Sequence, residues 1–339
     1  MADEYLKRIA NGEDLSFDES RELMLGVGRG EYSPVQVASI LTGLKVKGET
    51  VTEIAGCASA FRELALKVPH DIEGEVFDCC GTGGDGSGTF NISTAAAIVT
   101  AAMGAATAKH GNRAVSSQCG SSDVLESLGV RIDLNPDSAA KCLHETNFCF
   151  LFAPNYHPAM KYVAPVRREL GIPTLFNLLG PLLNPAACTH QIVGTPNARK
   201  AEVIAQTAHK IGLNNVTTMH NDLGIDEMIH GTNCYLHRAT DNGMDTRTLL
   251  VQDGEGARIE DLVGGDASTN ADIIRAIFGG EKSHRTSTVV LNAAVGLIVA
   301  GRFDSLDEAR TACADAIYSG KAKAKLRSIV EVTEERSDA

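Results

Sequence analysis

Residues 79–94 read CCGTGGDGSGTFNIST, a glycine-rich stretch that directly follows the apolar segment Val76–Cys80. We expect that segment to be a strand and Ser93–Met103 to be a helix, with the glycines forming the turn between them. The same alternation continues along the chain. It predicts further strands at Ala105–His110, Phe148–Ala153, His190–Thr195, Val216–His220, Asn233–His237 and Thr246–Val251.

Helices are expected between these strands, at Ser122–Leu128, after the Asn135-Pro136 cap, and at Ala198–Ile211, Asn270–Phe278, Ser287–Ala300 and Ser305–Tyr318. Strands that alternate with helices indicate an α/β domain with a central, mostly parallel sheet flanked by helices. Antiparallel strands are expected near residues 233–251, where two strands follow each other without a helix.

The first seventy residues predict helices only. Capping signatures begin three of them, at Ser16, Ser33 and Thr50, and we expect the third to continue to Pro69. Helices this short are not stable alone, so they should form a small bundle packed on the rest of the chain. A later segment, residues 157–187, is punctuated by prolines, which suggests a functional connection or a crossing between domains.

The overall composition excludes several classes of protein. The 339 residues carry a formal net charge of -12, which argues against a nucleic-acid or anionic-membrane partner. With 43% hydrophobic residues and no long apolar run, no membrane segment is expected. Nine cysteines without CxxC spacing indicate neither a zinc site nor a disulfide framework, and reduced thiols in a cytoplasm are the simplest interpretation.

The glycine-rich stretch contains GxGxxG, at Gly81, Gly83 and Gly86, so a dinucleotide site must be considered. That fold requires the helix to begin at once and an acidic residue about twenty positions later. Here the stretch continues through Phe90, and the next strand ends in Lys109-His110. A Walker-type phosphate loop also fails, because no Lys-Ser/Thr follows. Converging backbone N–H groups at a helix N-terminus still predict a site for phosphate.

Other polar residues follow the ends of further strands. KHGNR, residues 109–113, ends the second strand, and hydroxyl-rich residues 116–123 follow it. Asp226 and Glu227 come after the strand Val216–His220, and such paired carboxylates can hold Mg²⁺ that bridges to phosphates. Ligands of α/β sheets bind at the carboxyl ends of the strands, so we expect a site for a phosphorylated sugar. Either Arg167 or Arg168 could pair with a carboxylate substrate.

These motifs together resemble the anthranilate phosphoribosyltransferases over nearly the whole chain. The resemblance rests on GTGGD (81–85), NIST (91–94), KHGNR (109–113), HPAM (157–160), FNLLGP (176–181) with NP (184–185), and DE (226–227). It implies transfer of phosphoribosyl from phosphoribosyl pyrophosphate to the amine of anthranilate, with Mg²⁺, in tryptophan biosynthesis. It also implies a helical domain, residues 1–70 joined in space by part of 158–190, an α/β domain, residues 71–339, and a cytoplasmic homodimer through the helical domain.

The resemblance also implies roles for individual residues. The residues expected to contact phosphoribosyl pyrophosphate are Gly81, Gly84, Asp85, Thr89, Asn91, Ile92, Ser93, Thr94, Lys109, His110, Gly111, Asn112, Arg113, Ala114, Val115, Ser116, Ser117 and Ser121. Those expected at anthranilate are Gly81, His110, Asn112, His157 and Arg167. Ser93, Asp226 and Glu227 would serve the metal, and Lys109, Asn112 and Arg167 would be catalytic.

The sequence departs from the family pattern at Pro173, where the family often has arginine, and this removes a possible cation. The nearest alternative is a pyrimidine nucleoside phosphorylase, which resembles this family in fold, but residues 109–113 and 176–181 argue against it. A paralogue that accepts another ligand and a non-enzymatic binding protein are further alternatives. Release of pyrophosphate distinguishes an enzyme from the binding protein.

Overall fold

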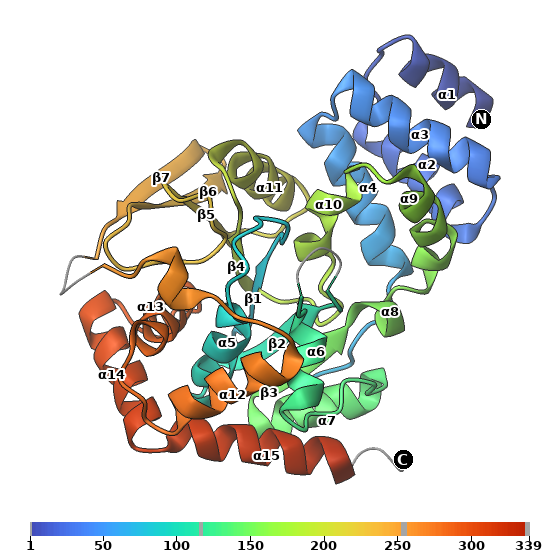
Figure 1. The fold of residues 1–339 in the computed structure, drawn as a ribbon. Helices are drawn as coiled ribbons and strands as arrows, with labels where there is room; N and C mark the ends of the chain where they lie inside the picture. The colour runs from blue at the N-terminus through green and yellow to red at the C-terminus, as the bar shows by residue number, and fades with distance from the viewer. Residues whose placement is uncertain (1, 115–117, 252–255, 336–339) are drawn as a thin grey trace.

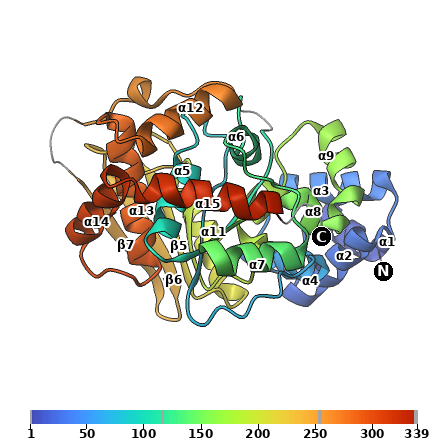
Figure 2. The same cartoon turned by 90° about the horizontal axis from the view of Figure 1, so that it is seen from below.

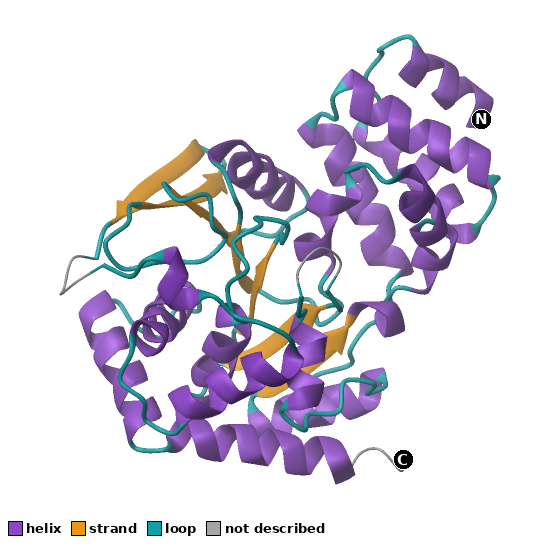
Figure 3. Ribbon diagram, in the orientation of Figure 1, coloured by secondary structure: helices purple, strands orange, loops and turns teal. Residues whose placement is uncertain are grey.

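The computed structural model describes residues 2–114, 118–251 and 256–335. Within these residues one seven-stranded sheet has the order β3-β2-β1-β4-β5-β6-β7 (Figures 1 and 3). Its strands are β1 Val76–Gly81, β2 Ala106–Gly111, β3 Phe148–Phe152, β4 His190–Gly194, β5 Asn215–Asn221, β6 Cys234–Thr240 and β7 Gly243–Leu249. The pairings from β3 to β5 are parallel, and β6 and β7 pair antiparallel. The predicted fold class is therefore confirmed.

The order of the strands creates a crevice at the centre of the sheet. From β1 the chain continues to β2 and β3 on one side, and then returns to β4 on the other side of β1. The connections that leave β1 and β4 therefore diverge at the carboxyl edge. Such a switch point is where α/β sheets bind their ligands.

Helices cover the sheet, and one of them is buried almost completely. They are α5 Ile92–Ala102, α6 Ser121–Ser127, α7 Pro136–Thr146, α11 Ala198–Lys210, α12 Ala267–Phe278, α13 His284–Val299, α14 Leu306–Tyr318 and α15 Lys321–Glu335, with a short 3₁₀ turn at Ile259–Leu262. The alanine-rich α5 has ten buried residues because it packs against α13 as well as β1 and β2. Figure 2 shows α15 crossing the molecule beside α7 and α5, which it contacts.

The N-terminal helices form a bundle around a second apolar cluster. They are α1 Ala2–Ala10, α2 Phe17–Arg29, α3 Pro34–Lys47 and α4 Val51–Leu64, and the three capping boxes are all present. The proline-punctuated segment joins this cluster (Figure 1) through α9 Ala164–Leu170, α10 Phe176–Leu179 and the 3₁₀ turns Pro158–Tyr162 and Gly180–Leu183, and the short helix α8 Ala153–Tyr156 precedes the segment. The rings of Phe61 and Phe176 meet edge to face, 4.9 Å between centroids.

Some predicted boundaries are wrong. The helix expected to reach Pro69 ends at Leu64, because backbone bonds from Leu66 to Tyr156 and from Val68 to Pro185 hold the chain extended. Helices α12 and α13 begin three residues earlier than predicted, at caps formed by Asp266 and Ser283. The helix α15 was not predicted. None of the helices in the described ranges is long and apolar enough to cross a membrane.

Candidate active site

The carboxyl ends of β1, β2 and β5 carry most of the polar residues that the sequence singled out. The first loop, residues 82–91, follows β1, and its Gly83 and Gly84 have left-handed backbone conformations at φ of 64° and 72°. A side chain at either position would strain the turn. Gly81 is required for a different reason, since a Cβ there would lie 2.1 Å from Oδ2 of Asp226. Only glycine lets the acidic loop after β5 approach the first loop this closely.

Asp226 and Glu227 each accept a backbone hydrogen bond from the residues that the sequence predicts to bind phosphate. Oδ2 of Asp226 accepts from Gly83 N at 3.0 Å, and Oε1 of Glu227 accepts from Ser93 N at 3.0 Å, at the N-terminus of α5. Burial, with repulsion from Asp85, raises the pKa of Asp226 to about 6. Burial and the neighbouring Asp226 raise the pKa of Glu227 to about 8. The raised pKa values mean that nearby positive charge does not offset the burial and mutual repulsion of these two acids. A bound cation would stabilise their charged forms.

The donor set around the acidic pair suits a hard divalent cation such as Mg²⁺. Carboxylate and hydroxyl oxygens are its usual ligands, and here they come from Ser93, Asp226 and Glu227. A small cavity of about 20 Å³ lies beside these residues, and Asn292 also lines it. Within the described ranges no group of three or more His, Cys, Asp or Glu side chains is arranged for a metal. A bound Mg²⁺ would therefore take its other ligands from water and phosphate oxygens.

Lys109 lies beneath the N-terminus of α5 and is almost fully buried, with 2% of its surface exposed. Its Nζ donates to Cys79 O at 2.7 Å and to Ser93 Oγ at 3.4 Å. Burial alone would lower the pKa of Lys109, but the surrounding negative groups outweigh it and raise the pKa above its ordinary value. The lysine is therefore a permanent positive charge directed at the residues expected to bind phosphate.

A buried carboxylate, Asp78, supports this arrangement and was missed by the sequence analysis. Asp78 accepts bonds from His110 N at 3.3 Å, from Asn184 Nδ2 at 2.8 Å and from Gln191 Nε2 at 3.1 Å. Burial raises its pKa to about 6, against the opposing charge of Lys109. An acid within the apolar strand Val76–Cys80 was the available signal. Asp78 connects the proline-punctuated segment to the strand that carries Lys109.

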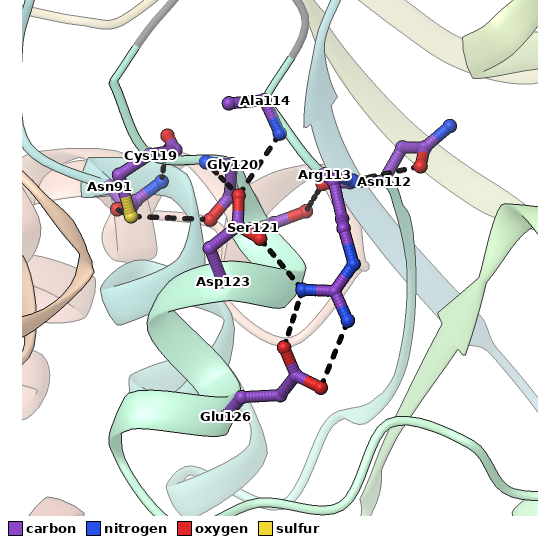
Figure 4. Close-up of polar contacts among 9 residues, drawn as sticks. All are labelled: Asn91, Asn112, Arg113, Ala114, Cys119, Gly120, Ser121, Asp123 and Glu126. Carbon is purple, nitrogen blue, oxygen red and sulfur yellow. Dashed lines mark hydrogen bonds and ion pairs between the residues drawn. The ribbon is translucent and has the colours of Figure 1, made fainter.

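The second loop, residues 112–120, follows β2, and Figure 4 shows side chains from its described part. Nη1 of Arg113 pairs with Asp123 at 2.9 Å, and Nη2 donates to Glu126 at 3.0 Å. Asp123, also missed by the sequence analysis, accepts from Gly120 N at 2.8 Å and Ala114 N at 3.0 Å. In this conformation the cation of Arg113 is directed at α6. The predicted contacts Val115, Ser116 and Ser117 lie outside the described residues.

Of the other residues predicted to contact phosphoribosyl pyrophosphate, the phosphoribosyl donor, some are exposed and some are buried. Gly84 and Asn112 are exposed, and Asp85 and Thr89 are half-buried in or beside the loops. Ile92 and Thr94 have 0% and 1% of their surface exposed, so neither presents a side chain to a ligand. Gly111 and Ser121 are in close contact, since a Cβ on Gly111 would lie 2.2 Å from Ser121 Oγ.

The residues expected at the aromatic substrate come from the ends of β1 and β2 and from the proline-punctuated segment. Nε2 of His110 lies 3.2 Å from Nε2 of His157. Burial lowers the pKa of His110 to about 3 and that of His157 to about 4, so both are neutral at pH 7. Arg167 is half-buried over the Phe176 ring, whereas Arg168 is exposed. Of the two arginines, Arg167 is therefore the one held in place.

Comparison with known proteins assigns both parts of the chain to described families. Residues 73–323 match "Glycosyl transferase family, a/b domain", and residues 3–65 match "Glycosyl transferase family, helical bundle domain". The anthranilate phosphoribosyltransferase of Herpetosiphon aurantiacus is 42% identical, covering 96% of this chain and 97% of the relative. That of Pelotomaculum thermopropionicum is 44% identical, covering 97% and 95%.

Solved structures agree with this similarity. The anthranilate phosphoribosyltransferase of Thermus thermophilus superimposes with a TM-score of 0.89 at 38% identity, covering 97% of this chain and 99% of the other. The enzyme of Saccharomyces cerevisiae, in complex with PRPP and Mg, superimposes with a TM-score of 0.88 at 25% identity, covering 98% of both chains. The similarity therefore extends over both the helical and the α/β parts.

Proposed function

This chain belongs to the anthranilate phosphoribosyltransferase family, and from that premise we propose which residues carry each part of the reaction. The enzyme transfers the phosphoribosyl group of phosphoribosyl pyrophosphate (PRPP) to the amine of anthranilate and releases pyrophosphate, in tryptophan biosynthesis. The observation that supports the division of roles is the contact of Asp226 and Glu227 with Gly83 and Ser93. This contact places two acids from a distant part of the sequence beside the first loop and the N-terminus of α5.

The donor is proposed to bind between the first loop, the second loop and the N-terminus of α5. Backbone N–H groups of the glycine loop and of Ser93 suit phosphate oxygens, and the buried Lys109 supplies a fixed positive charge. The yeast relative was solved with PRPP and Mg, and we propose Mg²⁺ here, held by Ser93, Asp226 and Glu227. When bound, Mg²⁺ would neutralise charge on the pyrophosphate.

Catalysis is proposed to be mainly electrostatic. The amine of anthranilate is a weak neutral nucleophile, and departure of pyrophosphate leaves an oxocarbenium-like ribosyl centre. Lys109 and the loop N–H groups would stabilise the leaving pyrophosphate, while the other residues align the amine with the ribosyl carbon. His110 and His157 are neutral at pH 7, and we assign neither of them a proton-transfer role.

Arg167 is proposed to pair with the anthranilate carboxylate, with Asn112, Gly81, His110 and His157 also lining the acceptor site. Burial lowers the pKa of Arg167, and its guanidinium can bind a carboxylate through two parallel bonds. Arg167→Ala should raise the KM for anthranilate at least tenfold by loss of such a pair, with a smaller effect on PRPP. Arg168→Ala is the matched control. Equal effects on both substrates would remove Arg167 from the acceptor site.

The activity itself is tested by mixing the protein with anthranilate, PRPP and Mg²⁺ and following the loss of anthranilate fluorescence. Pyrophosphate should appear in equal amount. Folded protein that consumes no anthranilate would contradict the assigned reaction. Phosphorolysis of a pyrimidine nucleoside in the same preparation would favour the nucleoside phosphorylase alternative.

We also propose that residues 1–70 and part of 158–190 form one domain and the rest of 71–339 another. The support is the apolar cluster that contains Phe61 and Phe176 together. Amides of α4 and α10 should then share one opening free energy in hydrogen exchange, distinct from that of β1. Different opening free energies for α4 and α10 would contradict this division.

We also propose that the enzyme is cytoplasmic and that it forms a homodimer through its helical domain. Val35 and Val46 on α3 are 75% and 82% exposed and supply apolar surface on this helix for a partner. Light scattering should give twice the chain mass, and Val35→Glu with Val46→Glu should give a monomer. Leu250→Glu, at another exposed apolar position, is the control. A wild-type monomer would contradict the proposal.

A further inference from the structure

A segment far along the chain lies against the first loop. Residues Leu262–Gly265, here called the clasp, follow a 3₁₀ turn and pair with residues 88–90. Thr89 and Val263 form an antiparallel bridge, Phe90 N donates to Leu262 O at 3.0 Å, and Gly264 N donates to Gly88 O at 2.9 Å. The outer half of the first loop is therefore held by the clasp as a short strand pair.

The clasp is itself fixed from two directions. Arg285 on α13 donates to Asp261 O at 3.2 Å and to Val263 O at 3.0 Å. On the other side, a Cβ on Gly264 would lie 2.5 Å from Asn270 Oδ1 and 2.7 Å from Phe90 Cα. There is no space between clasp, loop and Asn270, so a displacement of one displaces the others.

Asn270 on α12 connects these parts through its side-chain amide. Only 2% of its surface is exposed. Its Oδ1 accepts from Gly265 N in the clasp at 2.8 Å, and its Nδ2 donates to Asn91 Oδ1 at 2.9 Å. Asn91 in turn donates from Nδ2 to Cys119 O at 3.3 Å, in the second loop. One chain of amides therefore runs from α12 through the first loop to the second.

A purely local role for Asn270 does not account for these bonds. The N-cap of α12 is Asp266, whose side chain accepts from Thr269 N at 2.8 Å. The side-chain bonds of Asn270 go to the clasp and to the first loop, and both partners lie outside α12. An asparagine needed only for helix stability would not require a partner next to the N-terminus of α5.

We propose that Asn270 is a positioning residue for the donor: it orients the Asn91 amide and so sets the separation of the two loops that take PRPP. The inference rests on the proposed placement of the donor between these loops. Asn270 itself does not touch the substrate in this arrangement. Its contribution is to hold Asn91 in one orientation before the donor binds.

The test measures steady-state kinetics and melting temperature for Asn270→Ala and the nearly isosteric Asn270→Asp. Both should raise the KM for PRPP about tenfold, as loss of a residue that orients a ligand-binding group commonly does, with the KM for anthranilate within about twofold. Asn135→Ala is the matched control, because Asn135 caps α7 and touches neither loop. It should lower the melting temperature and leave both KM values unchanged.

A double-mutant cycle separates positioning from general destabilisation. In an Asn91→Ala background, Asn270→Ala should add no further rise in the PRPP KM, because the group it acts through is already gone. Additive effects, or an unchanged PRPP KM in both Asn270 variants, would overturn the inference. If Asp85→Ala also leaves the PRPP KM unchanged, the proposed donor placement fails as well; if it raises that KM, only the role of Asn270 fails.

Discussion

The two loops at the centre of the site resemble each other in composition but are held in different ways. The first loop is tied to Asp226, Leu262 and Gly264, all more than a hundred residues later in the chain. The described part of the second loop is tied mainly to Asp123 and Glu126, within one neighbouring helix, besides the bond from Asn91 to Cys119 O (Figure 4). The first loop therefore depends on the complete tertiary fold, while the second is organised mainly by its own sequence.

The difference extends to charge. Near the first loop the ionisable groups are buried, as Lys109 and Glu227, so electrostatic fields there are only weakly screened by solvent. In the second loop the Arg113 and Glu126 side chains are 51% and 42% exposed, and their pair is screened. Substitutions at the first loop should therefore act mainly on catalysis, and substitutions at the second loop mainly on local order.

The largest effect is expected for Glu227→Gln, beside the first loop. Loss of the carboxylate removes a proposed Mg²⁺ ligand from a buried site, and kcat/KM should fall by about two to three orders of magnitude. Stability should not fall, because burial and Asp226 already oppose the charged form of Glu227. Kinetics followed by anthranilate fluorescence measure kcat/KM, and thermal melting measures stability.

The control is Asp222→Asn, which changes an exposed acid in the loop after β5 and should change kcat/KM less than about twofold. A fall in kcat/KM of less than about tenfold for Glu227→Gln would contradict the expected difference between the two loops.

An intermediate effect is expected for Asp123→Ala, which removes the anchor of the second loop. Gly120 N and Ala114 N lose their acceptor, and the free energy of unfolding should fall by about 1–2 kcal/mol, as for loss of a helix cap. The KM for PRPP should rise several-fold and kcat should change little. Denaturant unfolding and kinetics measure these quantities. Asp133→Ala, an exposed acid paired with Arg131, serves as control. A fall in kcat as large as that of Glu227→Gln would show that the loops do not differ.

The smallest effect is expected for Arg113→Ala and Glu126→Ala, which break the exposed pair from either side. Each should cost less than about 1 kcal/mol, and the cost should diminish in high salt because the pair is screened. Both variants should change the PRPP KM equally and by less than about threefold. A tenfold rise confined to Arg113→Ala would instead place Arg113 on the donor, as the family resemblance predicts.

Much of the fold could be predicted because it depends on local patterns. Apolar strands, glycine turns and the capping boxes at Ser16, Ser33 and Thr50 are read from neighbouring residues, and the structure contains all of them. The end of α4 was predicted wrongly, because its termination depends on bonds to Tyr156 and Pro185. Helix α15 was missed since its buried face, with Leu326 and Ile329, is a narrow one on a mainly polar helix.

The sequence by itself determined the α/β class, the motifs of the site and their family. Only the tertiary structure decided how those residues are held. It bonded Asn91 to Asn270, directed Arg113 at Glu126, packed Arg167 over Phe176 and buried Asp78 near enough to Lys109 to influence its pKa. The physical reason is that a motif specifies chemical groups, whereas their partners and burial come from segments distant in sequence. Those partners set the charge, the orientation and the pKa that the chemistry uses.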